Sequence, residues 1–452
     1  MKKKTRQLVA IIGGGVAGSE AAAQLAKRGI CCLLFDQQTL PYGKIEEGLP
    51  KWHVKLRDQE EQKIDQKIDH PDIYYIPRTG LGRDITLNEL QAWGVSAIVL
   101  AVGAWRDRRL PIKDIDDYIG RGLYYQNQLV SWFNHNHESR PRVSPYEIQD
   151  GSIVIGGGLA SLDVVKIVMF EIVLEALRKK GIKADLFSLE KEGIPFILKQ
   201  QGLTVKKLGI KGCTLYYRRR IEDMPLTPLP PSIDKTRKQK IFELRKRILA
   251  NYQQKYCFTV KERHFPFDKI IENDRLAGIV FQIGESQSQK TSAAPSKLIK
   301  IKAPLVVSSI GSVPDKLAEI PLQDDLIMLE DPQTGKVKGY DNIFAVGNAV
   351  TGRGNIRESL IHSREISQIL MRDFLEWQTD HFEELVRQQE LNTVQTVTEL
   401  DRQLKSRAAL SAATISEIHD KVRKLQRRVG YEGNYREWIR KNLPLRLENM
   451  EQ

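Results

Sequence analysis

The chain has 452 residues, of which 41% are hydrophobic and 28% are charged. At roughly 150 residues per domain, this length predicts about three compact units and excludes a single small domain. The composition excludes a disordered polyelectrolyte. It also excludes a membrane protein, because the longest nearly uncharged apolar stretch, residues 94–105, is too short to span a bilayer.

The net charge of +13 is concentrated in one part of the chain. Residues 201–264 contain sixteen basic and five acidic side chains, whereas residues 372–452 contain fourteen of each. This local excess favours one anionic ligand or one partner surface. Much of it, residues 235–247, equally has the pattern of a solvated amphipathic helix. We expect no nucleic acid partner, since no aromatic side chains are interleaved with the basic ones to form a platform.

The cysteines, Cys31, Cys32, Cys213 and Cys257, include no C-x-x-C pair and no spacing typical of a metal site. This pattern argues against a disulfide scaffold, a zinc site and a dithiol redox centre. We therefore expect no metal, and a reducing compartment such as the cytoplasm.

The first motif is a strand, a glycine turn and a helix near the N-terminus. The apolar residues 8–12 precede a Gly-x-Gly-x-x-Gly pattern, residues 19–28 favour a helix, and a second strand at residues 30–35 ends in Asp36. This spacing predicts a dinucleotide site with the pyrophosphate at the helix N-terminus and the carboxylate on a ribose hydroxyl. The residues assigned to this site are Gly13, Gly15, Val16, Ala17, Gly18 and Asp36.

A second motif, Gly-x-Gly-x-x-Ser, follows a strand at residues 151–155 and precedes a helix at residues 162–180. After a long insertion, the strand at residues 213–217 runs into Arg218, Arg219 and Arg220, where the first motif has an acid. Guanidinium groups there favour a 2′-phosphate. Two charge-assisted bonds of roughly 1.5–3 kcal/mol each predict a preference of about a hundredfold or more for NADPH over NADH. The residues assigned to this site are Gly156, Gly158, Leu159, Ala160, Ser161, Arg218, Arg219 and Gly311.

Two later strands, at residues 96–103 and 305–311, each end in a glycine that lets the chain pass close to a cofactor. Residues 342–347 predict another strand, followed by a loop and a helix at residues 357–370 whose start can present backbone donors to a flavin. An acid at the first site and arginines at the second imply bound FAD and visiting NADPH. The residues added to the FAD site are Val102, Gly103, Gly347, Asn348, Gly354, Asn355 and Ile356.

With these motifs, residues 7–372 resemble the two-dinucleotide-binding flavoproteins of the adrenodoxin reductase type and the allied glutamate synthase small subunit. The resemblance rests on IIGGGVAGSEAA, LPYGKIEEGLP, GRDITLNEL, LAVGAWRDRRLPI, SWFNHN, LYYRRRIEDMP, VVSSIG and FAVGN. It implies an FAD domain interrupted by an NADP domain, and it adds Gly43 to the FAD site. The chain departs from the pattern at Asn348, where an Asp often touches FAD, and it lacks the N-terminal iron-sulfur region of the glutamate synthase branch.

We therefore expect an α/β fold with two Rossmann-like domains and a C-terminal helical extension. The expected boundaries are residues 1–115 and 340–372 for the FAD domain, 150–335 for the NADP domain and 373–452 for the extension. In the extension, apolar residues alternate at spacings of three and four from Ile415 to Val429, which is typical of a packed helix seam. Packing on the core or a helical hairpin is favoured over a coiled coil, and a homo-oligomer or complex through these helices stays open.

The resemblance implies transfer of a hydride from NADPH to FAD, followed by electron delivery to an acidic partner such as a ferredoxin. Two alternatives stay open. One is a flavoprotein subunit of a larger enzyme or a quinone or small-molecule reductase, and the other is a non-catalytic nucleotide-binding regulator. His53 is a candidate for proton movement near the flavin, with Lys51 and Trp52 as further neighbours, although a surface or packing histidine is the favoured explanation.

Overall fold

The computed structural model describes residues 6–138, 146–227, 229, 233–284, 297–332, 334–351 and 374–450, with residues 351 and 374–385 described by their backbone alone. The described chain divides into two compact units. Unit 1 comprises Met1–Leu49, His53–Arg106 and Val313–Gln452, and unit 2 comprises Pro50–Trp52 and Asp107–Ser312. Unit 2 thus begins and ends earlier than the expected NADP domain, and the C-terminal helices belong to unit 1.

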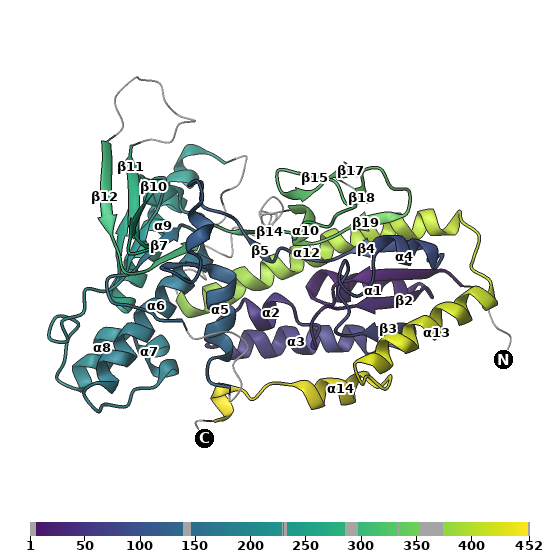
Figure 1. The fold of residues 1–452 in the computed structure, drawn as a ribbon, viewed down its shortest axis with the longest axis horizontal. Coiled ribbons are helices and arrows are strands. Elements are labelled where there is room, and N and C mark those ends of the chain that lie inside the picture. The colour runs from purple at the N-terminus through teal and green to yellow at the C-terminus, as the bar shows by residue number, and fades with distance from the viewer. Residues whose placement is uncertain are drawn as a thin grey trace. The chain divides into compact units, whose positions relative to one another are not determined.

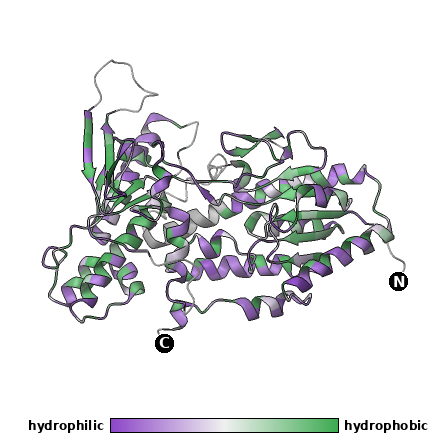
Figure 2. Ribbon diagram, in the orientation of Figure 1, coloured by the Kyte–Doolittle hydropathy of each residue, from purple (hydrophilic) through white to green (hydrophobic). Residues whose placement is uncertain are grey.

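Unit 1 is built on a largely parallel sheet with the strand order β17-β18-β19-β4-β1-β2-β3 (Figure 1). The strands from β19 to β3 are parallel, whereas β18 and β17 join the edge antiparallel. The central strands read as continuous apolar runs, as expected for parallel strands covered on both faces (Figure 2). The strands are β1 (Leu8–Ile12), β2 (Cys31–Phe35), β3 (Ile73–Ile76), β4 (Ala97–Leu100), β17 (Leu329–Asp331), β18 (Lys336–Val337) and β19 (Ile343–Ala345), with a small ribbon of β15 (Leu322–Gln323) and β16 (Leu326–Ile327) beside them.

The two faces of this sheet carry separate hydrophobic clusters, because alternate side chains of a strand point to opposite sides. Val9 and Ile11 of β1 pack with helices α1, α3, α12 and α14, whereas Leu8 and Ala10 pack with α4, α10 and α13. The helices are α1 (Val16–Lys27), α2 (Lys44–Glu47), α3 (Val54–Ile68), α4 (Leu87–Ala92), α10 (Asn348–Thr351), α12 (Phe374–Lys405), α13 (Ala412–Arg428) and α14 (Tyr435–Asn442), with a final 3-10 turn, η4 (Leu447–Asn449).

The apolar seam of the extension lies on α13 and faces the core of unit 1. Ile418 and Val422 are buried in the cluster that contains Leu8 and Phe35, and Gln426 donates a hydrogen bond of 2.8 Å to the backbone oxygen of Tyr75. The seam therefore packs on the core, as favoured from the sequence, and this face of α13 is not a free dimerisation surface.

Unit 2 contains a parallel sheet in the order β6-β13-β7-β8-β9 and an antiparallel sheet in the order β10-β11-β12. Side chains of β11 pack against one face of the parallel sheet, where the ring of Phe281 stacks on that of Tyr216 at 4.4 Å between centroids. Helix α6 is the buried helix that follows β7 and packs against it and β13.

Unit 2 contains further short strands and helices besides those already described. The strands are β6 (Leu123–Tyr125), β7 (Ile153–Gly156), β8 (Thr214–Tyr216), β9 (Thr259–Lys261), β10 (His264–Glu272), β11 (Arg275–Ile283), β12 (Lys297–Lys302) and β13 (Val306–Ser309). The helices are η1 (Ile115–Tyr118), α5 (Gln126–His135), α6 (Leu159–Arg178), α7 (Leu186–Glu192), α8 (Ile194–Gln200), η2 (Ile221–Asp223) and α9 (Lys235–Tyr256). The chain passes between the units on either side of residues 50–52, and again at β5 (Arg106–Asp107) and β14 (Ser312–Val313).

No described helix combines the length and the apolarity that a bilayer crossing requires.

Candidate functional site

The first glycine turn brings the end of β1 into contact with the start of α1. Gly13 has a φ of +104°, and a Cβ at this position would lie 2.4 Å from the backbone oxygen of Ala101. A Cβ on Gly18 would lie 1.7 Å from the oxygen of Gly13, so only glycine allows the helix to approach this closely. Gly15 precedes α1 and has no atom within 4 Å of its Cβ position. The turn therefore presents bare backbone and the N-terminal amides of α1 to an open space.

Asp36 follows β2 directly and closes this turn from the side. Its Oδ2 accepts a hydrogen bond of 2.7 Å from the backbone N–H of Gly14, and its Oδ1 accepts one of 2.7 Å from that of Gln38. Burial raises the pKa of Asp36 to about 6, while the two backbone hydrogen bonds oppose this shift. The Asp36 carboxylate can accept further hydrogen bonds, but its burial excludes water as a donor. A ribose hydroxyl would supply this donor in place of water.

A cavity of about 330 Å³ opens above this turn, entirely within unit 1. Its walls come from the ends of β1, β2, β4 and β19, from the loop that leads into α2, and from α12. The carboxyl ends of parallel strands are where open α/β sheets bind nucleotides. The predicted FAD residues that line it are Gly13, Gly15, Val16, Ala17, Asp36, Gly43, Val102, Gly103, Gly347 and Asn348.

Some predicted residues lie elsewhere. Gly18 lies under the turn and serves the close packing of α1. Gly354, Asn355 and Ile356 and the expected helix at residues 357–370 lie outside the described residues.

Other lining residues were missed from the sequence. Tyr42 and Trp105 lie in loops and Lys44 is the first residue of α2, and the Lys44 ammonium lies 5.9 Å from the centroid of the Trp105 ring. Val386 and Gln389 line the cavity from α12, although the extension was expected to have no counterpart in the family.

The candidate catalytic histidine does not line the cavity. His53 stands directly before α3, where its backbone oxygen accepts a hydrogen bond of 2.9 Å from Arg57. Lys51 and Trp52 are buried within unit 2, where Lys51 donates a hydrogen bond of 2.8 Å to Asn136 and Trp52 packs on the ring of Phe133. A role for His53, Lys51 and Trp52 near a flavin stays a prediction.

The second glycine turn, in unit 2, has the same local design. A Cβ on Gly156 would lie 2.4 Å from the backbone oxygen of Ser309 and 2.6 Å from the Cβ of Ser161. Ser161 is fully buried and its hydroxyl donates to the backbone oxygen of Gly158, so the serine fills the third position of the motif without exposing a polar group. Gly158 precedes α6, which then begins with Leu159 and Ala160.

The strand register identifies the counterpart of Asp36. Ile12 pairs with Phe35 in unit 1, and Ile155 pairs with Tyr216 in unit 2. The residue at the position of Asp36 is therefore Tyr217, one place earlier than the arginines. A Cβ on Gly157 would lie 2.1 Å from the ring of Tyr217. The second turn is covered by an aromatic ring where the first is capped by a carboxylate.

Arg218, Arg219 and Arg220 follow this ring and are exposed. The loop after them is held by Arg245, a buried residue of α9 that donates a hydrogen bond of 2.9 Å to the backbone oxygen of Glu222 and contacts Thr227. The arginines thus stand on a fixed loop at the end of β8, facing outward from unit 2. Gly311, assigned to the same site, has a φ of +102° and accepts a hydrogen bond of 2.9 Å from Arg108.

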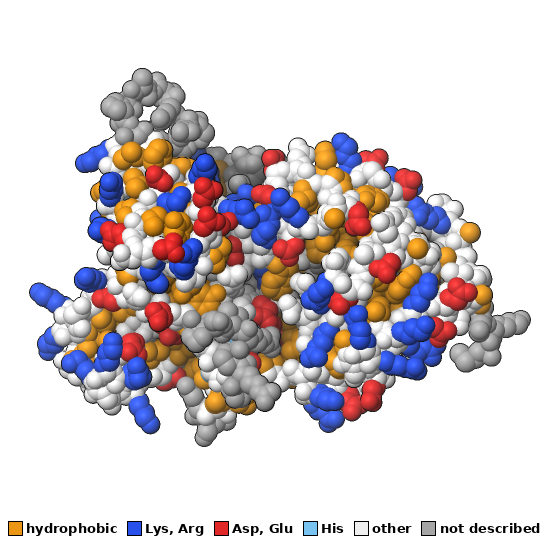
Figure 3. Space-filling model, viewed as in Figure 1, with side chains coloured by type: hydrophobic (Ala, Val, Ile, Leu, Met, Phe, Trp, Pro, Cys, Tyr) orange, Lys and Arg blue, Asp and Glu red, His pale blue; other side chains and the backbone are white. Residues whose placement is uncertain are grey.

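Part of the basic excess is engaged in ion pairs. Lys246 of α9 lies 3.2 Å from Glu222 and 3.3 Å from Glu243. Basic and acidic side chains are interspersed on the face of unit 2 seen in Figure 3. Helix α9 also buries Ile248, Leu249 and Tyr252 on one side, so it is the amphipathic helix that the sequence offered as the alternative explanation.

The comparisons with known proteins agree with this arrangement. Residues 7–169 match the family described as pyridine nucleotide-disulphide oxidoreductase. The chain is 25% identical over 317 residues to the mitochondrial NADPH:adrenodoxin oxidoreductase of Arabidopsis thaliana, covering 65% of this chain and 63% of that protein. It is 30% identical over 176 residues to the glutamate synthase [NADPH] small chain of Bacillus subtilis, covering 36% and 33%. The chain thus spans less than two-thirds of each of these curated relatives.

The fold of Mycobacterium tuberculosis FprA, solved in complex with NADPH, superimposes with a TM-score of 0.65 at 18% identity, covering 93% of this chain and 91% of that one. This match confirms the predicted α/β fold class, and the relatives confirm the resemblance inferred from the motifs.

Proposed function

We propose that this chain, whose residues 7–169 match the pyridine nucleotide-disulphide oxidoreductase family, is an FAD-containing reductase that takes its electrons from NADPH. The observation that carries the proposal is the pair of glycine turns in one chain. They share a strand register but differ in charge, with a buried carboxylate at the first and exposed arginines at the second.

The cavity of unit 1 suits a resident FAD. Bare backbone at Gly15 and the N-terminal amides of α1 would bind the pyrophosphate, and Asp36 would accept a ribose hydroxyl. Bound there, the flavin would accept a hydride and release electrons singly, which is chemistry that the cofactor supplies. The protein's contribution is to hold the dinucleotide and to exclude water from the carboxylate, which is 6% exposed.

The turn of unit 2 suits a visiting NADPH. The amides at the start of α6 would face its pyrophosphate, and Arg218 and Arg219 would bind its 2′-phosphate. An unphosphorylated ribose would find no carboxylate at this strand end, because Tyr217 occupies the position of the acid. The geometry therefore favours NADPH over NADH.

We propose an acidic iron-sulfur protein of the ferredoxin type as the electron acceptor. The Arabidopsis relative is named for adrenodoxin, and the exposed basic side chains of residues 201–264 suit a negatively charged partner. We also propose a cytoplasmic location, because the cysteines are free thiols, three of them buried, as is usual in a reducing compartment.

The test begins with the purified full chain. It is expected to be yellow or to become so when loaded with FAD, and anaerobic NADPH should bleach the flavin faster than NADH. A colourless chain that cannot be loaded would contradict the proposal. Electron transfer to a ferredoxin supports the proposed acceptor, whereas transfer to quinones alone would replace it with a small-molecule reductase.

A further inference from the structure

Two segments of the C-terminal part of unit 1 bear on the candidate flavin cavity, one by lining it and one by holding its wall. From α12, Val386 and Gln389 line the cavity itself. The Gln389 amide donates a hydrogen bond of 2.9 Å to Oδ1 of Asn348, another lining residue. Asn348 is therefore oriented by a residue some forty positions later in the chain. The other segment runs from Tyr435 to Glu448, and we call it the C-terminal clamp.

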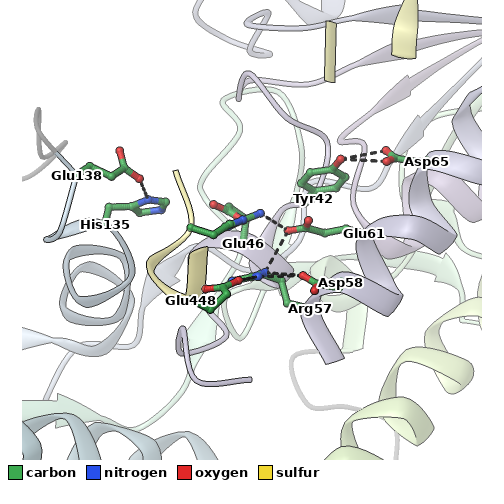
Figure 4. Close-up of polar contacts among 10 residues, drawn as sticks. Tyr42, Glu46, Arg57, Asp58, Glu61, Asp65, His135, Glu138 and Glu448 are labelled. Carbon is green, nitrogen blue, oxygen red and sulfur yellow. Dashed lines mark hydrogen bonds and ion pairs between the residues drawn. The ribbon is translucent and has the colours of Figure 1, made fainter. Parts of the chain in front are cut away.

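The clamp holds the loop that forms one wall of the cavity. Trp438 donates a hydrogen bond of 2.8 Å to the backbone oxygen of Thr39, just before that wall. Tyr435 donates one of 2.6 Å to Asp65 of α3, which also accepts hydrogen bonds of 3.1 Å from Tyr42. Tyr42 lines the cavity, and its hydroxyl points to Asp65 (Figure 4). The clamp therefore reaches a wall residue through one carboxylate.

A buried charge cluster makes the second connection. Arg446 of the clamp lies 2.6 Å from Glu46 of α2 and 2.8 Å from Glu61 of α3. Beside it, Arg57 contacts Glu61 and Glu448, and these side chains gather at one place (Figure 4). Lys44 and Ile45, the two residues that precede Glu46 in α2, line the cavity. A helix as short as α2 has little stability of its own, so its position depends on such anchors.

We propose that the C-terminal clamp is a positioning element of the flavin site. Arg446, acting through Glu46, and Tyr435, acting through Asp65 and Tyr42, hold the wall at residues 42–45 in the conformation that receives the dinucleotide. The inference rests on the proposed function, since it assigns the clamp to retention of the proposed FAD. The clamp side chains act through other residues, because none of them lines the cavity.

The physical reason is the cost of leaving buried charges unpaired. Without the Arg446 guanidinium, Glu46 and Glu61 lose the cation that joins α2 to α3, and Glu46 is left buried without that positive charge. Movement of α2 away from α3 would return this carboxylate to water. A lysine at this position keeps the positive charge. Its single ammonium nitrogen, however, replaces the two guanidinium nitrogens with which Arg446 contacts two carboxylates. It should therefore restore part of the effect.

The experiment measures FAD binding to the apoprotein of the full chain by quenching of flavin fluorescence. Arg446→Ala is expected to weaken FAD binding at least about tenfold, with R446K intermediate and Tyr435→Phe about threefold weaker than wild type. The matched control is Arg436→Ala, which removes an ion pair between α14 and Asp69 of α3 but no contact with the wall. It should bind FAD like wild type.

The outcomes separate the two proposals. If the wild-type chain does not bind FAD, the proposed function fails. If wild type binds FAD and both Arg446→Ala and Tyr435→Phe bind it equally well, the clamp inference is wrong and the proposed function stands. Should Arg446→Ala fail to fold, Tyr435→Phe decides the matter alone, since it removes a single hydroxyl. In enzyme saturated with FAD, the ratio of NADPH to NADH activity should be unchanged in each clamp variant.

Discussion

The two glycine turns of this chain use one backbone design for two different charges. In both, a parallel strand leads into a glycine turn, a second strand pairs with the first in the same register, and a helix begins at the turn. The residue after the second strand is Asp36 in unit 1 and Tyr217 in unit 2. The carboxylate receives backbone N–H groups, whereas the ring packs over Gly157.

This difference indicates that the general binding of a dinucleotide and the choice between dinucleotides depend on different parts of the site. The turn and the helix start are common to both, so they can serve the pyrophosphate that all dinucleotides share. The side chains at the second strand end differ, and this position faces the ribose. We infer that changes at the strand ends should alter which nucleotide binds, and that changes in the turns should alter whether one binds at all.

The largest expected effect is at the arginines. Replacement of Arg218 and Arg219 by Ala should lower kcat/KM for NADPH about a hundredfold or more and leave the value for NADH nearly unchanged. Steady-state kinetics with both nucleotides measures this, and Lys235→Ala, in the same basic segment, is the matched control. Equal use of NADH by the unmodified protein would refute the assignment.

The next effect is a dependence on pH that only the first turn should show. Burial raises the pKa of Asp36 to about 6, so the apoprotein has its full stability from this group below about pH 4 and loses it as the pH rises through 6. The loss is at most about 3 kcal/mol, from two pKa units at 1.36 kcal/mol each. Denaturant unfolding of the apoprotein between pH 4 and 7 measures this loss.

The Asp36→Asn variant should lack the part of the fall in unfolding free energy with rising pH that comes from Asp36. This holds whatever the absolute stability of the variant. A Tyr217→Phe variant should keep the slope of wild type. An unchanged slope in Asp36→Asn would show that another group titrates in this range.

The smallest effect concerns the ring that covers the second turn. Gly157→Ala places a methyl group within 2.1 Å of the Tyr217 ring, which must move, and overpacking of this kind typically costs about 1–3 kcal/mol. We expect NADPH binding to weaken about tenfold. The double variant with Tyr217→Ala should recover much of the loss, as measured by titration with NADPH. A double variant no better than Gly157→Ala would mean that the ring is not the obstacle.

Local spacing made the centre of each unit predictable. The strand, turn and helix around Gly13, and the acid that ends the next strand, lie within some thirty residues, so sequence order alone brings them together. The same holds around Gly156, because its strand, its glycine turn and the start of its helix also follow one another directly in the sequence. The α/β fold class followed from these patterns, and the inward packing of α13 followed from the spacing of its apolar residues.

The rest of the site depends on contacts that spacing does not encode. Val386 and Gln389 reach the cavity from a helix more than 300 residues after the glycine turn, and nothing in their local sequence marks them. The role of Tyr217 required the register of two strands, because the insertion between α6 and β8 hides its correspondence to Asp36. The bounds of unit 2 were also hidden, since residues 50–52 belong to it while their neighbours do not.

The pairing of Arg446 with Glu46 has a consequence for the biosynthesis of the protein. Four hundred residues separate the partners. At about 5–20 residues per second, a ribosome adds these residues in roughly 20–80 s. During that time the wall of the cavity is made but not yet anchored, and β19 is missing from its sheet for most of it. Cofactor loading is thus expected after release from the ribosome, and nascent chains stalled before residue 435 should bind flavin weakly.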